Sequence, residues 1–166
     1  MKEELKYAFA KLENATNRLK EGTDKAKDEL GEDGVIQRFE FNFELFWKTL
    51  KIFLYDRGID ARTPHDVLSE AFKLEWLNNE DVFLNMLEDR NKTSHIYDRQ
   101  VSREIFERIK NEYVSALEEI LKMLRTLMTV EGERLRTKCP KKCRKLRERP
   151  TEDEMSEEVP KAPRTA

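Results

Sequence analysis

The sequence predicts an all-α fold, an antiparallel up-down bundle of four to five helices followed by a disordered, charged C-terminal tail. The 166 residues are 40% charged and include only five Gly and five Pro, a composition rich in Leu, Glu and Lys that is typical of helical proteins. Apolar residues recur at intervals of three and four, which indicates amphipathic helices. Because this spacing ends near Val130, we expect the bundle over residues 1–129 and the tail over 130–166.

The first two helices differ in how much apolar surface they carry. The first has one apolar face, formed by Leu5, Phe9, Leu12, Ala15 or Thr16, and Leu19. Residues 21–34 are polar with three Gly, and we expect a long connection or a short frayed helix there. The second helix, about Val35 to Arg57, has a main apolar stripe at Phe39, Phe43, Phe46, Leu50 and Phe53, widened by Phe41, Leu45, Trp47 and Leu54. This width predicts burial on more than one side, in the core and at a subunit contact.

Helix-end signals divide the rest of the bundle. Gly58 is expected to form a left-handed cap, and Thr63 with Pro64 marks the start of a third helix, with the lone His65 on its surface. A fourth helix follows the capping residues 78–81 and ends at the stretch that contains Arg90. We expect Ser102 to cap a fifth helix of about 25 residues, whose stripe is Ile105, Ile109, Tyr113, Ala116, Ile120, Leu124 and Leu127.

Composition limits the class of protein. No apolar run approaches the roughly 20 residues of a membrane span, and no signal-peptide core opens the chain, so we expect a cytoplasmic protein without a membrane partner. The net charge of −2 gives no overall bias toward nucleic acid. Cys139 and Cys143 lack a second pair of ligands and cannot close a tetrahedral zinc site, so we expect neither a metal nor a cofactor.

The tail changes the sign of its charge along its length. Residues 134–149 contain nine Lys or Arg and a single Glu, and acids dominate from 151 to 158. No apolar face offsets the entropy of ordering, so disorder is expected. The tail is either a solvated segment or an electrostatic arm for RNA, since clustered basic charge favours phosphate contacts.

Residues 88–98 gather the side chains with the most chemistry. Within them lie Arg90, Asn91, His95 and Tyr97. The β-branched Thr93 and the hydroxyl of the next residue favour a kink or helix end, which would bring Arg90, His95 and Tyr97 to one opening. The alternative is an ordinary helix C-terminus, where cations collect against the negative end of the dipole.

These residue types suit a metal-independent ribonuclease. An imidazole such as that of His95 transfers protons near neutral pH, and the Arg90 fork binds phosphate oxygens while staying charged. Asn91 would orient the imidazole or a phosphate oxygen, and Tyr97 would donate to phosphate or be open to modification. A homodimer that brings two such stretches together would supply a second acid or base.

The run from Arg90 to Tyr97 resembles the Arg-x4-His-x-Tyr signature of HEPN domains of the HepT type. Residues 37–51, together with the Thr63–Pro64 pair and residues 70–73, resemble the nucleotidyltransferase substrate-binding protein family. The resemblance covers about residues 5–127 and implies a HEPN-like bundle that dimerises and partners a separate small nucleotidyltransferase.

Two functional accounts follow from this resemblance. In one, the chain is a ribonuclease toxin with Arg90 and His95 catalytic, Asn91 in support, and Tyr97 the residue to which the partner antitoxin adds AMP. In the other, it is a non-enzymatic substrate-binding subunit of a two-component nucleotidyltransferase. The sequence departs from the family at residues 74–77, where Leu-Glu-Trp-Leu is bulkier than the small, Gly-containing link expected there, and the tail lies outside the resemblance.

Overall fold

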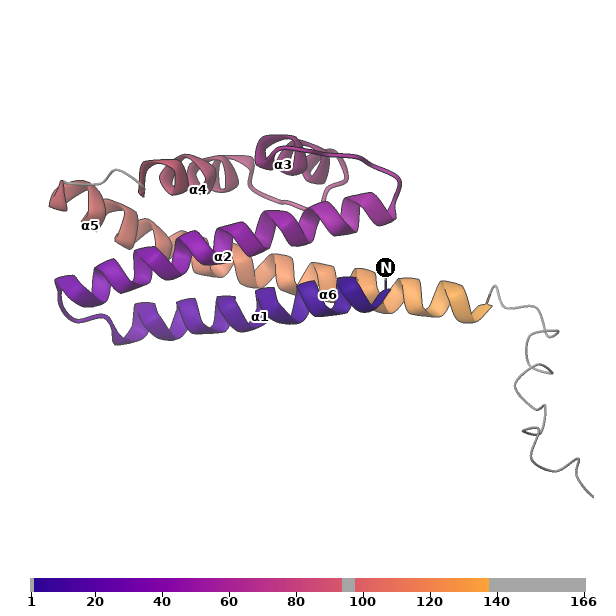
Figure 1. Cartoon of the computed structure of the whole chain (residues 1–166), viewed down its shortest axis with the longest axis horizontal. Coiled ribbons are helices and arrows are strands. Elements are labelled where there is room, and N and C mark those ends of the chain that lie inside the picture. The colour runs from indigo at the N-terminus through magenta and orange to yellow at the C-terminus, as the bar shows by residue number, and fades with distance from the viewer. Residues whose placement is uncertain (1, 94–97, 138–166) are drawn as a thin grey trace, which may run out of the picture. The chain divides into compact units, whose positions relative to one another are not determined.

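The computed structural model describes residues 2–93 and 98–137, and within these ranges every regular element is a helix (Figure 1). In chain order the elements are α1 (Lys2–Lys25), α2 (Glu29–Asp56), α3 (Pro64–Lys73), α4 (Glu80–Thr93), α5 (Arg99–Arg108), the π-helical turn η1 (Ile109–Tyr113) and α6 (Val114–Thr137). The predicted all-α bundle is confirmed. In this part of the chain, no helix is both long and apolar enough to cross a membrane.

The chain divides into two units, Met1–Leu127 and Met128–Ala166. In the second unit, α6 continues to Thr137, so helical backbone extends beyond the end of the apolar spacing at Val130. Residues 131–137 are mostly good helix formers, which accounts for the continuation. The predicted domain boundary at residue 129 stays a prediction, and the rest of the tail, with both cysteines, lies outside the described residues.

Helix α2 is the centre of the first unit, since it packs against α1, α3, α4 and α5 (Figure 1). Its main stripe is almost completely buried, with exposed fractions of 0–1% at Phe39, Phe43, Phe46, Leu50 and Phe53. Helix α1 runs antiparallel to it, and the buried Asn42 amide donates to the Thr16 hydroxyl at 3.2 Å between them. The widened face is only partly buried: Leu54 is enclosed, whereas Phe41 is 60% exposed.

The prediction of a long connection or a short frayed helix over residues 21–34 is wrong. Helix α1 runs to Lys25 and α2 begins at Glu29, so only residues 26–28 separate them. The side chain of Asp28 caps α2 by accepting from the Gly31 amide at 2.8 Å. Gly inside a helix costs only about 1 kcal/mol relative to Ala, which the neighbouring cap and the packing of α1 on α2 outweigh.

The ends of α3 show one expected cap and one strained one. Thr63 is the N-cap and Pro64 the first helical residue, as predicted, and Thr63 and Asp66 also form a reciprocal capping box. At the other end, Glu75 adopts φ 57°, and the Trp76 amide donates to the Ala71 carbonyl at 3.0 Å in a Schellman-type cap. A non-glycine residue, Glu75, is therefore in a left-handed conformation that favours Gly, at the link where the sequence was expected to depart from the family. Gly58, at φ 82°, caps α2 as predicted.

The predicted fifth helix differs in its start and its interior. Asp98, not Ser102, is the N-cap: its side chain accepts from the Gln100 amide at 2.8 Å, whereas the Ser102 amide already donates to the Asp98 carbonyl. The single helix expected here consists of α5, η1 and α6 in succession. The π-helical turn adds one residue to a turn, a distortion that often occurs near functional sites.

Candidate functional site

Arg90, in the last turn of α4, is held by two side chains. Its Nη2 donates to Oε1 of Glu44 on α2 at 2.6 Å, and its Nη1 donates to Oδ1 of Asn91 at 3.3 Å. The Arg90 and Glu44 side chains are 38% and 30% exposed, so the pair is accessible from solvent. The structure thus brings the predicted Arg90 and Asn91 together and adds a carboxylate from 46 residues away in the sequence.

The structure describes α4 as far as Thr93, so the kink or helix end predicted there stays a prediction. In the last described turn of α4, the Thr93 hydroxyl donates to the Arg90 carbonyl at 2.7 Å. Residues 94–97 follow, and the predicted site residues His95 and Tyr97 lie outside the described residues.

Glu44 also contacts a second cation. Lys48 Nζ lies 3.1 Å from Glu44 Oε2, so the two carboxylate oxygens face different positive groups. Partial burial opposes ionisation of Glu44, but the hydrogen bond from Lys48 and the charge of Arg90 outweigh it and lower the pKa of Glu44 below its ordinary value. The carboxylate is therefore charged at neutral pH and is a weak base.

A buried hydrogen-bond network at Asp89, the residue before Arg90, joins α4 to α5 and η1. The buried Asp89 carboxylate accepts two hydrogen bonds from Arg108 on α5, and a third from the Tyr113 hydroxyl at 2.6 Å. Burial and the hydrogen bond to Asp89 raise the pKa of Tyr113 well above its ordinary value, and the same carboxylate raises the pKa of Arg108. Because Asp89 immediately precedes Arg90, this network determines how the Arg90 side chain leaves the helix.

The start of α5 is anchored as well. Arg99 forms ion pairs with Glu29 at 2.5 Å and with Glu32 at 3.7 Å, both in the first turns of α2. The two helices that flank residues 94–97 are therefore each tied to α2, one through Arg90 and one through Arg99.

The arrangement around Arg90 is suited to binding an anion. Two cations, Arg90 and Lys48, converge on one carboxylate and leave one positive charge uncompensated among the three groups. Sequence reasoning missed Glu44, Lys48, Asp89 and Arg108. The i,i+4 spacing of Glu44 and Lys48 is visible in the sequence, but nothing local indicates the contact with Arg90.

A surface depression lined by the loop after α2 and by residues of α3 from His65 to Lys73 is less suited to binding. His65 lies there on the surface, as predicted. The carboxylates that line this depression already have partners: Asp60 pairs with Arg62, Asp66 belongs to the capping box, and Glu70 pairs with Lys73. Within the described ranges, no three His, Cys, Asp or Glu side chains are grouped so as to hold a metal ion.

Comparison with known proteins supports one relationship over most of the bundle. Residues 3–126 match the model of a family described as nucleotidyltransferase substrate binding protein like. A crystal structure of a Thermus thermophilus protein is 33% identical, with a TM-score of 0.65, over 69% of this chain and 98% of that one. HI0074 from Haemophilus influenzae is 24% identical, with a TM-score of 0.53, over 75% and 99% of the two chains. Its structure is described as the fold of a substrate-binding domain of a nucleotidyltransferase. No curated protein sequence matches the chain.

Proposed function

Because the chain belongs to the family of nucleotidyltransferase substrate-binding-like proteins, we propose that it acts beside a separate small nucleotidyltransferase. We further propose that it is a metal-independent ribonuclease of the HEPN type, silenced when the transferase adds AMP to Tyr97. The observation that carries this proposal is the Arg90 guanidinium, half-exposed at the end of α4 and directly before the rest of the signature.

Cleavage requires one phosphate-binding group and two proton transfers. Arg90 binds the non-bridging phosphate oxygens, and Asn91 supports it. His95 accepts the proton of the 2′-hydroxyl as that oxygen attacks phosphorus, and the bond to the 5′-oxygen breaks. The leaving oxygen takes a proton from an acid, and the products are a 2′,3′-cyclic phosphate and a 5′-hydroxyl. Glu44, with its lowered pKa, is a poor source of that proton.

A homodimer would supply the second acid. The outward face of α2 supports this part of the proposal, because it carries Phe41 and Tyr55, 60% and 64% exposed, with the half-buried Leu45 and Ile52 between them. These apolar residues recur at the spacing of a helix–helix seam, and Phe41 and Tyr55 are mostly exposed in the described unit. The stripe adjoins Glu44 and Lys48, so a second copy on this face would place its own signature stretch near the first.

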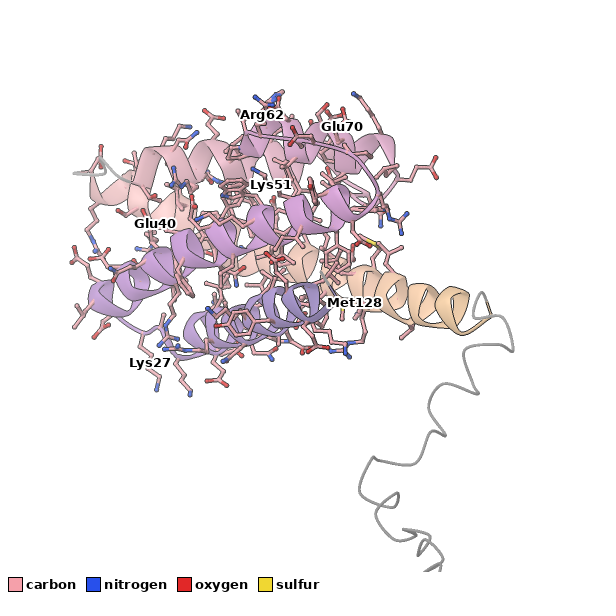
Figure 2. All side chains as sticks on the ribbon, turned by 45° about the vertical axis from the view of Figure 1, so that its right-hand side comes forward. Lys27, Glu40, Lys51, Arg62, Glu70 and Met128 are labelled. Atoms are coloured by element: carbon pink, nitrogen blue, oxygen red, sulfur yellow. The ribbon has the colours of Figure 1, made fainter. Side chains whose placement is uncertain are left out.

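The test uses purified protein, free of its partner and unmodified, with cellular RNA in the presence of EDTA. We expect cleavage with 2′,3′-cyclic phosphate ends, and its loss in Arg90→Ala and in His95→Ala. Helicity and thermal melting should be nearly unchanged in Arg90→Ala, since the ion pair is half-exposed. Arg62→Ala, an exposed cation on the loop before α3, is the matched control and should cleave normally (Figure 2).

The second candidate is a non-enzymatic substrate-binding subunit. It is favoured by the Arg90 guanidinium, which already holds the Glu44 carboxylate and the Asn91 side chain. A group of this kind can hold an anionic ligand, and binding alone requires no proton transfer. If the unmodified wild type cleaves no RNA yet binds the nucleotide substrate of the transferase, this second function replaces the first.

A further inference from the structure

The Glu44 carboxylate lies between two cations that come from different helices. Arg90 of α4 contacts its Oε1 at 2.6 Å and Lys48 of α2 contacts its Oε2 at 3.1 Å. A Glu and a Lys four residues apart on one helix often pair without further meaning. Arg90 comes from another helix and adds a third charged group to this pair. The three-group cluster therefore forms only where α4 packs on α2.

The cluster has the properties of a filled anion site. Its side chains are 30% exposed at Glu44, 38% at Arg90 and 58% at Lys48, so solvent and ligands reach all three. A carboxylate presents two oxygens that share a negative charge, as a phosphoryl group does, and Arg forks and Lys ammonium groups bind both kinds of anion. The two cations therefore surround a position that a phosphoryl group fits.

We propose that Arg90 and Lys48 form a phosphoryl-binding subsite, which the Glu44 carboxylate fills in the free protein and leaves when ligand binds. Lys48 is then a binding residue, and Glu44 is an internal competitor. This subsite rests on the proposed function in one respect: its ligand carries a phosphoryl group, either of an RNA backbone or of a nucleotide. Displacement is feasible because half-exposed ion pairs are weak and exchange with solvent ions.

If Glu44 competes with the ligand, removing its negative charge should improve ligand binding. We would measure the affinity of a fluorescently labelled, 2′-O-methylated RNA, which cannot be cleaved, by anisotropy, and the affinity of ATP in a separate titration. Glu44→Gln keeps the size of the side chain and removes its charge, so we expect affinity for at least one ligand to rise about three- to tenfold. Lys48→Gln should lower affinity, and Glu44→Gln should give a smaller gain when Lys48→Gln is also present, because the two changes act on one subsite.

A matched control comes from α3. Glu70 accepts from Lys73 at 2.6 Å and is 31% exposed, which closely resembles Glu44 in exposure and in its lysine contact (Figure 2). Glu70→Gln changes the net charge by the same amount, so any general electrostatic gain appears equally there. We expect no more than a twofold effect from it.

The outcomes separate this inference from the proposed function. If Glu44→Gln binds both ligands no better than Glu70→Gln, or more weakly than wild type, Glu44 only orients Arg90 and the subsite is disproved. If it binds more tightly while the wild type cleaves no RNA, the subsite stands and the ribonuclease proposal fails. The ligand whose affinity rises identifies the source of the phosphoryl group.

Discussion

Asp89 and Arg108 join α4 to α5 through two hydrogen bonds, at 2.8 and 2.9 Å, between one carboxylate and one guanidinium. The carboxylate is 4% exposed and the guanidinium side chain 34% exposed, so the pair lies at the boundary of the core. Since Asp89 also neighbours Arg90, the same contact stabilises the bundle and orients the candidate site.

Removing Arg108 should strongly destabilise the protein. Arg108→Ala leaves the Asp89 charge buried with only the Tyr113 hydroxyl as donor, and we expect a loss of about 3 kcal/mol in the free energy of unfolding, at the low end for buried pairs because Arg108 is partly exposed. Urea unfolding followed by circular dichroism measures it. Lys6→Ala, which breaks an exposed pair with Glu3, is the control and should stay within about 0.5 kcal/mol of wild type. Equal effects from the two variants would mean that the pair does not anchor α4.

Replacing Glu75 by glycine should stabilise the fold. Glu75 is held at φ 57° by the cap at the end of α3, and glycine adopts this conformation without a steric cost. We expect Glu75→Gly to raise the free energy of unfolding by about 0.5–1 kcal/mol, despite the greater entropy of its unfolded chain. Lys27→Gly, in the connection between α1 and α2, is the control and should lower stability slightly (Figure 2). A loss in Glu75→Gly as large as in the control would contradict the strain argument.

Stability should fall at alkaline pH because of Tyr113. Its pKa in the folded protein lies above the ordinary value of 10.0, so from about pH 10 upward the unfolded chain loses a proton that the folded protein keeps. The unfolded state is then favoured more with each increase in pH, whereas below this range the contribution of Tyr113 is constant. Tyr113→Phe should show a flatter decline in urea midpoint above about pH 10, and a curve parallel to wild type below it. Parallel curves throughout would exclude Tyr113 as the group responsible.

The outward stripe of α2 should mediate self-association. Light scattering at micromolar concentration should give twice the chain mass of 19.8 kDa for wild type and a lower value for Phe41→Glu, because a charge at the seam is desolvated in the dimer. Tyr7→Glu is the control on α1, since Tyr7 is 62% exposed, close to the 60% of Phe41. A monomeric wild type would remove both the dimer and the shared site from the proposed function.

Tyr97 should be the residue through which the transferase acts. Co-incubation with a cognate transferase, ATP and Mg²⁺ should raise the intact mass by one AMP group and stop RNA cleavage, because a bound phosphodiester competes for Arg90. Tyr97→Phe should keep at least part of its cleavage activity and escape modification. Tyr55→Phe, which removes a phenol that is 64% exposed on α2, should be modified like wild type. An unchanged wild-type mass with an active transferase, or equal modification of Tyr97→Phe, would show that the switch does not act through this residue.

The sequence by itself determined the elements whose causes are local. The buried stripe of α2, the capping box at Thr63 and the left-handed Gly58 follow from side-chain spacing and from hydrogen bonds over three or four residues. Local signals were misleading at two places. Asp98 and Ser102 both suit an N-cap, but Asp98 is the one that caps the helix. The polar, glycine-containing residues 21–34 indicated a connection, but most of them belong to α1 or α2.

Only the tertiary structure decided which charges meet. Glu44 and Arg90 are 46 residues apart, and Asp89 and Arg108 are 19 apart across a change of helix, so no local pattern links either pair. Their contacts depend on the rotation of α4 against α2 and η1, which the packing of buried apolar side chains determines. From the sequence, such charged residues are expected on a solvated helix surface. Only the packing of the helices makes them part of a site.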